Sequence, residues 1–171
     1  MSNNIIVQAM NIAYAAHNGQ YRRGNGEPYI NHPKRVVALL GELLPSVTQE
    51  MYAAAWLHDV LEDTAVTADE ILESTNSLVL DYVRLLTKDR KMSEKEYFDR
   101  LACAPVPVQN IKLCDILDNM ADLAGMDDEE WAIKSLIKRN RTINYLTEAD
   151  PVLYTAVQNR INSLKHLFNL K

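Results

Sequence analysis

The segment Ala53–Asp63, AAAWLHDVLED, joins a run of small and apolar residues to a cluster of ionisable side chains. The apolar run predicts a buried helix from about Gln49 to Glu62, with Thr48 as its N-terminal cap. The cluster that follows holds one imidazole and three carboxylates: His58, Asp59, Glu62 and Asp63. The segment therefore predicts a buried helix that carries several charges.

These charges need a partner if the helix is buried, because each unpaired buried ion costs several kcal/mol. Asp59 lies three residues before Glu62 and four before Asp63, so these carboxylates share neighbouring faces of one helix. A divalent cation would neutralise them, and mixed imidazole and carboxylate ligands suit Mn²⁺, Fe²⁺ or Zn²⁺ better than Ca²⁺. The alternative is a His-Asp pair on a helix surface, or a core histidine satisfied by hydrogen bonds.

Helical periodicity extends over almost the whole chain. Apolar residues recur at helical spacing in Ile5–Ala16 and in Val108–Ala124, and Pro33 fits the first turn of another helix. Polar caps are expected at three further helix starts: Thr67 with Glu70, Ser93 with Glu96, and Asp150 before Pro151. With no clear strand and no internal repeat, the sequence predicts an all-α globule of about eight helices.

Two further residues strengthen the metal interpretation. His32 lies in the segment Pro28–Pro33, PYINHP, and Asp115 ends the segment Ile111–Asp115, IKLCD, which is expected in a buried helix. Arg22 precedes both in a glycine-containing loop, and an arginine can grip a phosphate with two hydrogen bonds or stack on a purine.

With these residues in place, the sequence resembles the HD-domain metal phosphohydrolases. Within them, it is most similar to the hydrolase module of RelA/SpoT-type proteins and to the small alarmone hydrolases. The matching segments occur in the family's order and at similar spacings: Ala16–Arg23, Pro28–Pro33, Leu57–Thr64, Thr87–Lys88, and Ile111–Asp115 with Asn119. The resemblance implies an all-α HD-domain globule.

The resemblance also implies a metal centre. Four residues would ligate one divalent ion, typically Mn²⁺: His32, His58, Asp59 and Asp115. Such an ion would leave positions open for water and for a phosphate oxygen of the substrate.

The resemblance assigns Glu62 and Asp63 to the positioning and deprotonation of the attacking water. Physical reasoning agrees, because a carboxylate one helical turn from a metal ligand can reach that water. The alternative is that both are ordinary acids at a helix end.

The substrate contacts implied by the resemblance are Arg22 and Arg23 against the nucleotide and Asn119 near its sugar. The alternatives are a solvated basic pair and a surface amide. His17 is interpreted as a packing histidine or as one that supports a metal-bound histidine, and both Cys103 and Cys114 as packing residues.

The sequence departs from many relatives after Asp115. Relatives commonly carry an arginine and then a histidine or tyrosine where this chain has Ile116 and Asp118, and Ala121–Asp122 also differs. We interpret these as changes in the wall that faces the substrate.

Three functions follow from this pattern. The first is removal of the 3′ pyrophosphate from (p)ppGpp-like alarmone nucleotides by a metal-activated water. The second is hydrolysis of another nucleotide or phosphorylated cofactor. The third is a catalytically silent nucleotide-binding module. A nucleotide panel assay with and without chelator separates them.

Composition limits the remaining possibilities. The chain has 171 residues, which fits one domain over residues 1–171. Its motifs lie between 16 and 119, and C-terminal helices over 127–171 are expected to pack on it. Such a length leaves no room for an attached synthetase. The net charge is -5. The acidic charge argues against extended nucleic acid, and neither a targeting segment nor a membrane span is visible.

We expect a cytoplasmic protein, because two cysteines do not make a disulfide scaffold. The apolar C-terminal helix can pack on its own core or on a partner. A homo-oligomer is therefore possible, although core packing is the commoner explanation.

Overall fold

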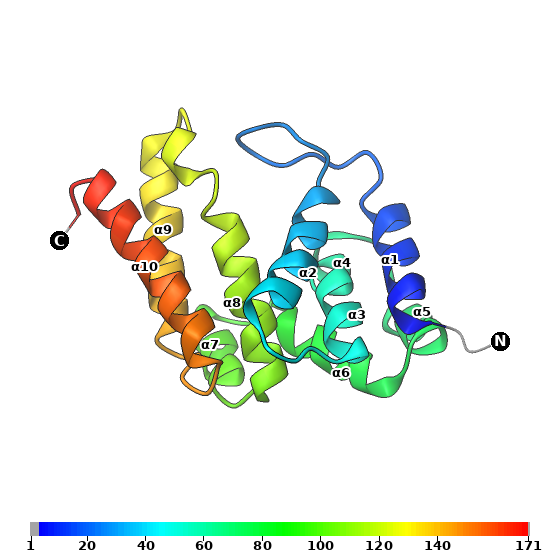
Figure 1. The fold of residues 1–171 in the computed structure, drawn as a ribbon. Coiled ribbons are helices and arrows are strands. Elements are labelled where there is room, and N and C mark those ends of the chain that lie inside the picture. The colour runs from blue at the N-terminus through cyan, green and yellow to red at the C-terminus, as the bar shows by residue number, and fades with distance from the viewer. Residues whose placement is uncertain (1–3, 171) are drawn as a thin grey trace.

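The computed structural model describes residues 4–170, which form an all-α structure (Figure 1), as the sequence predicts. They contain nine α-helices of seven residues or more, the four-residue helix α4 and the 3₁₀ helix η1. The elements in chain order are α1 (Ile5–Ala16), α2 (Asn31–Leu43), α3 (Gln49–Leu57), α4 (Val60–Asp63), α5 (Ala68–Ser74), α6 (Ser77–Leu86), α7 (Glu94–Ala102), α8 (Val106–Asn119), η1 (Leu123–Gly125), α9 (Glu129–Ile143) and α10 (Pro151–Leu167).

Helix α8 occupies the centre of the molecule. It packs against α2, α3 and α6 on one side and against α10 and α7 on others, so it joins the N-terminal helices to the C-terminal ones (Figure 1). Most of its side chains are buried, and they include Ile111 and Leu113 as well as the polar residues Asp115 and Asp118. A polar residue on this helix is therefore held rigidly by its surroundings.

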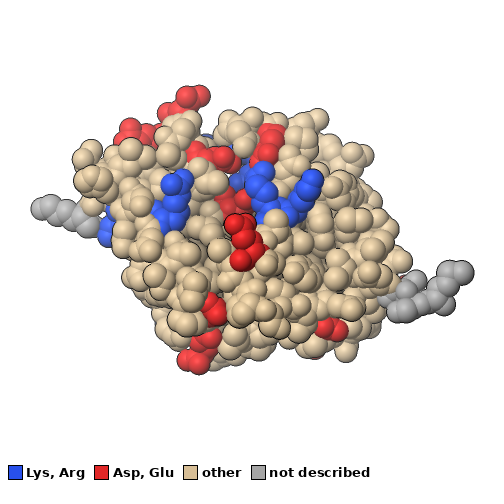
Figure 2. All heavy atoms as spheres, in the orientation of Figure 1, with Lys and Arg blue, Asp and Glu red and all other residues tan. Residues whose placement is uncertain are grey.

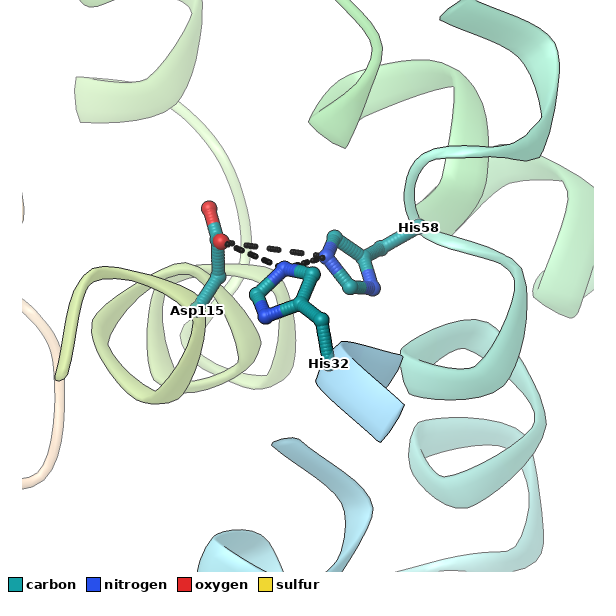
Figure 3. A group of neighbouring side chains, drawn as sticks. All are labelled: His32, His58 and Asp115. Atoms are coloured by element: carbon teal, nitrogen blue, oxygen red, sulfur yellow. Dashed lines mark hydrogen bonds and ion pairs between the residues drawn. The ribbon is translucent and has the colours of Figure 1, made fainter. Parts of the chain in front are cut away.

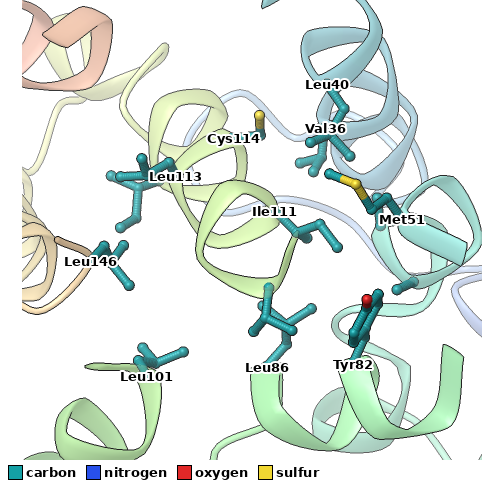
Figure 4. Packing of buried hydrophobic residues seen from close by; sticks show 14 of the residues in the cluster. Val36, Leu40, Met51, Tyr82, Leu86, Leu101, Ile111, Leu113, Cys114 and Leu146 are labelled. Carbon is teal, nitrogen blue, oxygen red and sulfur yellow. The ribbon is translucent and has the colours of Figure 1, made fainter. Parts of the chain in front are cut away.

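The hydrophobic core surrounds α8 in a continuous cluster. Figure 4 shows Ile111 and Cys114 facing Val36 and Leu40 of α2, while Leu113 points toward the C-terminal helices. Burial of side chains of this size stabilises the fold by about 1.5–3 kcal/mol each. The core thus fixes the relative positions of α2, α3 and α8, which carry the site.

The predicted helix caps are confirmed. Thr48 accepts a hydrogen bond from the Met51 amide at 3.2 Å, and Asp150 caps α10 ahead of Pro151. Both capping boxes form, at Thr67 with Glu70 and at Ser93 with Glu96.

The predicted helix over 49–62 is wrong in one respect, because it is interrupted. Helix α3 ends at Leu57, and α4 begins only at Val60. The His58 side chain donates its Nδ1 proton to the Ala55 carbonyl oxygen at 2.7 Å, and this is the carbonyl that the Asp59 amide would use in a continuous helix. The His-Asp doublet therefore sits in a turn.

Three other expectations need adjustment. The helical run predicted over Val108–Ala124 stops at Asn119 and is followed by η1. Cys103 is exposed and only Cys114 is buried, so the packing role predicted for both applies to one. In α10 the structure buries four of the six apolar residues against the core, while Val152 and Leu167 stay exposed.

Among residues 4–170, no helix combines the length and the apolar character that crossing a membrane requires.

Candidate metal centre

Three buried side chains from distant parts of the chain converge on one point (Figure 3). His32 lies in the first turn of α2, His58 in the turn between α3 and α4, and Asp115 on α8. The Nε2 atoms of the two histidines are 3.1 Å apart, and the Asp115 Oδ1 atom lies 3.2 Å from that of His32 and 3.8 Å from that of His58. This is the spacing of groups that could hold one metal ion.

Both imidazoles are oriented through their other nitrogen. His58 donates Nδ1–H to the Ala55 carbonyl oxygen at 2.7 Å, and His32 donates Nδ1–H to Asp118 Oδ2 at 2.6 Å. A proton on Nδ1 leaves a lone pair on Nε2 in a neutral imidazole, so both lone pairs point at the common centre. The histidines are thus prepared as ligands.

Asp59 is the fourth residue whose side chain lies at the centre. Its Oδ2 atom lies 3.1 Å from His58 Nε2 and 3.4 Å from His32 Nε2. The same oxygen accepts a hydrogen bond of 2.6 Å from the hydroxyl of Tyr29. The structure therefore brings together all four residues that the sequence singled out for the metal.

The electrostatics of the centre favour a cation. Burial opposes a charge on His32, yet bonds to Asp115, Asp118 and Asp59 outweigh it and raise the His32 pKa to about 9. Burial likewise opposes charge on Asp115, but Lys112 and the histidines hold the pKa of that carboxyl well below its usual range. The negative field that retains these protons would also attract a divalent metal ion. The two imidazoles and two carboxylates of the centre are suitable ligands for such an ion.

The two predicted catalytic acids leave the centre in different directions. Glu62 lines a cavity that Asp115 also lines, and its Oε2 accepts the Lys88 amide hydrogen at 2.9 Å. Asp63 faces the opposite side, where the Tyr29 hydroxyl donates to it at 3.4 Å. Burial, and then the charges of Asp59 and Glu62, raise the pKa of Asp63.

The two predicted arginines have separate environments. Arg22 is enclosed by carboxylates and lies 3.6 Å from Asp118, and its Nη2 donates to Asn119 Oδ1 at 3.4 Å. The side chain of Arg23 is 62% exposed, and its guanidinium lies 4.8 Å from the centre of the Trp131 ring. Only Arg23 therefore has the solvated character of a surface basic residue.

Three cavities adjoin one another along this side of the molecule. The Trp131 cavity, about 200 Å³, is lined by Arg22, Arg23 and Tyr29 and shares Asn119 and Arg139 with the next. The Asp115 cavity, about 150 Å³, has Asp115 and Ile116 in its wall. The Arg84 groove, about 590 Å³, shares Glu62 and Lys88 with the Asp115 cavity. Of the four residues of the candidate metal centre, Asp115 lines the middle cavity of this row.

Asp118 does not line the Asp115 cavity, although we interpreted it as part of the wall that faces the substrate. Only 4% exposed, it lies behind His32 and receives a hydrogen bond of 2.6 Å from Arg35 Nε. Arg35 also makes two hydrogen bonds to Glu27, at 2.6 and 3.0 Å. Of the departures considered, Ile116 borders the Asp115 cavity and Asp122 borders the Trp131 cavity.

Figure 2 shows how charged side chains are distributed on one face of the molecule. On the face seen in Figure 2, basic and acidic side chains gather next to one another in the upper half, and the lower half is largely uncharged. Charges on this face thus occur mainly as mixed groups of both signs.

Sequence reasoning missed two functional neighbours. Tyr29 bridges Asp59 and Asp63, and Lys112 forms an ion pair of 2.7 Å with Asp115. Both lie in segments that carried the resemblance, and a lysine three residues before a buried aspartate was a usable signal. His17, as expected, is buried and packs on the Tyr29 ring with centroids 4.7 Å apart.

The chain is similar in sequence to two curated enzymes. Bifunctional (p)ppGpp synthase/hydrolase SpoT of Escherichia coli is 36% identical over 129 residues, which cover 70% of this chain and 18% of that protein. The guanosine-3′,5′-bis(diphosphate) 3′-pyrophosphohydrolase MESH1 of Danio rerio is 29% identical over 133 residues, covering 75% of this chain and 74% of that one. The chain thus spans only about a fifth of the long relatives but most of the short one.

The fold is shared with a solved structure described as a metazoan ortholog of SpoT that hydrolyzes ppGpp. The TM-score is 0.87 at 22% identity, over 96% of this chain and 97% of the other. The family model described as HD domain matches residues 9–151. Because that match covers most of the sequence, the chain belongs to the HD domain family.

Proposed function

We propose that this protein is a Mn²⁺-dependent phosphohydrolase that removes the 3′ pyrophosphate from (p)ppGpp-like nucleotides. The observation that carries the proposal is the convergence of His32, His58, Asp59 and Asp115 beside a cavity that a carboxylate and several cations line. The names of the SpoT and MESH1 relatives support this choice of substrate.

The four converging residues are the proposed metal ligands. When bound, the ion would lower the pKa of a water molecule and stabilise negative charge on the phosphoryl oxygens. Because both imidazoles already present Nε2, binding requires only the loss of protons from the centre.

The proposed reaction is hydrolysis of the 3′ phosphate ester. A bond forms between the water oxygen and phosphorus, and the bond from phosphorus to the 3′ oxygen breaks. The products are inorganic pyrophosphate and a nucleotide with a free 3′ hydroxyl, which is the 5′-diphosphate from ppGpp and the 5′-triphosphate from pppGpp.

Two carboxylates of this chain would manage the protons. Glu62 is the proposed base, because its side chain lines the Asp115 cavity. Asp63, whose pKa is raised, is suited to hold a proton next to Tyr29. The 3′ oxygen takes up one proton when it leaves.

The nucleoside would lie in the Trp131 cavity. The guanidinium of Arg23 over the Trp131 ring offers a surface for a purine, and Asn119 lines both this cavity and the Asp115 cavity. Arg139 lines both cavities and would meet the phosphates between them.

The test is turnover of a nucleotide panel by the purified protein with Mn²⁺, with and without a chelator. We expect release of pyrophosphate from (p)ppGpp, lost on chelation. Ile116, an apolar residue in the Asp115 cavity, favours the second candidate, a different phosphorylated substrate. Exclusive turnover of another panel member would establish it, and tight binding without product would establish a silent binding module.

We also place this activity in the cytoplasm. The exposed thiol of Cys103 and the buried one of Cys114 are both free, which suits a reducing compartment.

A further inference from the structure

Apart from Glu62, the residues that line the Arg84 groove have no part in the roles assigned so far, although it is the largest of the three adjoining cavities at about 590 Å³. Arg84 is in the last turn of α6, and Arg90 and Lys91 are in the loop that follows. The groove meets the Asp115 cavity at Glu62 and Lys88, which line both. The two cavities are therefore neighbours, with Glu62 and Lys88 at their boundary.

The groove is basic, although the chain as a whole has a net charge of -5. Its wall contains two acids, Glu62 and Asp89, and both already accept backbone hydrogen bonds, from Lys88 at 2.9 Å and from Lys91 at 2.8 Å. The wall's arginines and lysines outnumber these acids: Arg84, Lys88, Arg90, Lys91 and Arg100.

Most of these cations lack an anionic partner. Within residues 4–170, Arg84, Arg90 and Lys91 take part in no ion pair, whereas Arg22, Arg23 and Arg35 around the metal centre all do. The Nε atom of Arg100 is buried without a hydrogen-bond partner. The groove therefore has unused capacity to bind an anion.

The loop that carries the groove is fixed at both ends. Arg100 donates to the Thr87 carbonyl oxygen, and the Lys88 ammonium donates to the Met92 carbonyl oxygen at 2.7 Å. The cations between these anchors are thus held beside the groove before any ligand arrives, which reduces the entropy lost on binding.

From this geometry we propose that the Arg84 groove binds the distal phosphate of the substrate's 3′ diphosphate and then holds the released pyrophosphate. The inference rests on the proposed function. A nucleoside in the Trp131 cavity and a reacting phosphorus in the Asp115 cavity leave the groove as the next space along the row. The distal phosphate of a 3′ diphosphate is negatively charged, so cations are needed in the space beyond the reacting phosphorus.

The experiment measures binding of inorganic pyrophosphate to chelator-treated, metal-free protein by titration calorimetry, without turnover. In the triple variant Arg84→Gln, Arg90→Gln, Lys91→Gln we expect the Kd for pyrophosphate to rise roughly tenfold, as for the loss of three exposed charge contacts. We also expect the wild-type protein to bind pyrophosphate more tightly than orthophosphate.

A matched control removes three cations that line none of these cavities: Lys34→Gln, Arg141→Gln and Lys165→Gln. The control should keep the wild-type Kd, and circular dichroism should show all variants folded. An unchanged Kd in the groove variant, or equal losses in both triple variants, would overturn the proposal.

A turnover arm separates this proposal from the proposed function. If the alarmone is a substrate, added pyrophosphate should inhibit the groove variant less than the wild type, and equal inhibition would count against the groove. If the alarmone is not a substrate, the metal-free titration still decides whether the groove binds pyrophosphate.

Discussion

His32 and His58 present the same atom to the same centre, but different kinds of acceptor orient them. His58 is held by the carbonyl of Ala55, three residues earlier in its own segment. His32 is held by the carboxylate of Asp118, which lies 86 residues away on α8 and is itself bound by Arg35. The acceptor of His58 is a neutral backbone group nearby in the sequence, whereas the acceptor of His32 is a charged side chain from another helix. Only the acceptor of His32 can therefore be altered by a side-chain substitution alone.

The largest expected effect comes from removing an imidazole outright. His58→Ala should abolish both Mn²⁺ binding and turnover, because one of the four converging groups and its Nε2 donor atom are lost. Elemental analysis of the purified variant measures this. His166→Ala, which removes an exposed imidazole, is the control, and stoichiometric Mn²⁺ in His58→Ala would exclude His58 as a ligand.

The next prediction, with a smaller expected effect, separates metal binding from catalysis. Glu62→Gln leaves both histidines untouched and should lower kcat by roughly 10²–10⁴-fold while Mn²⁺ affinity stays as in the wild type. Steady-state kinetics beside a Mn²⁺ titration check this, with the exposed Glu73→Gln as control. Wild-type turnover in Glu62→Gln would remove this carboxylate from the mechanism.

The comparison between the two histidines is tested by Asp118→Asn, because Asp118 accepts the Nδ1 proton of His32 whereas His58 donates to Ala55. The amide is nearly isosteric but uncharged, so we expect Mn²⁺ affinity to fall about 10–100-fold, as for other partners of metal-bound histidines. Electron paramagnetic resonance of free Mn²⁺ gives the affinity.

The matched control is Asp122→Asn, because Asp122 follows Asp118 by one turn and has no hydrogen bond to His32. It should retain wild-type Mn²⁺ affinity. If Asp118→Asn binds Mn²⁺ equally well, the charged acceptor is unnecessary and the two histidines are equivalent.

The smallest effect on Mn²⁺ affinity is expected for Arg35, which contacts Asp118 and not a histidine of the centre. Arg35 holds Asp118 but its side chain is 37% exposed, so water can replace part of its contact. Arg35→Gln should weaken Mn²⁺ binding only about 2–5-fold. The same titration measures it, with Arg141→Gln as control. A loss as large as that of Asp118→Asn would mean that Arg35 determines the position of the carboxylate.

Local features of the fold were predictable from the sequence because they depend on neighbouring residues. Thr48 and Asp150 cap helices through hydrogen bonds to residues at most three positions away. Apolar residues at helical spacing identify the buried faces of α2 and α10. The four residues of the candidate metal centre were also named from the sequence, since the resemblance implied their order along the chain.

The features that were missed depend on contacts that no local pattern encodes. Tyr29 reaches Asp59 across 30 residues, and Asp118 reaches His32 across 86. The interruption of the helix at His58 was missed because its cause is a side chain competing with the backbone for one carbonyl.

That interruption has a consequence for building such centres anew. In a regular helix successive side chains diverge by about 100°, so adjacent residues cannot both face one ion. Here His58 Nε2 and Asp59 Oδ2 come within 3.1 Å because the backbone turns between α3 and α4. A designer who grafts the dipeptide onto a straight helix would therefore obtain one ligand, and the template to copy is the bent backbone.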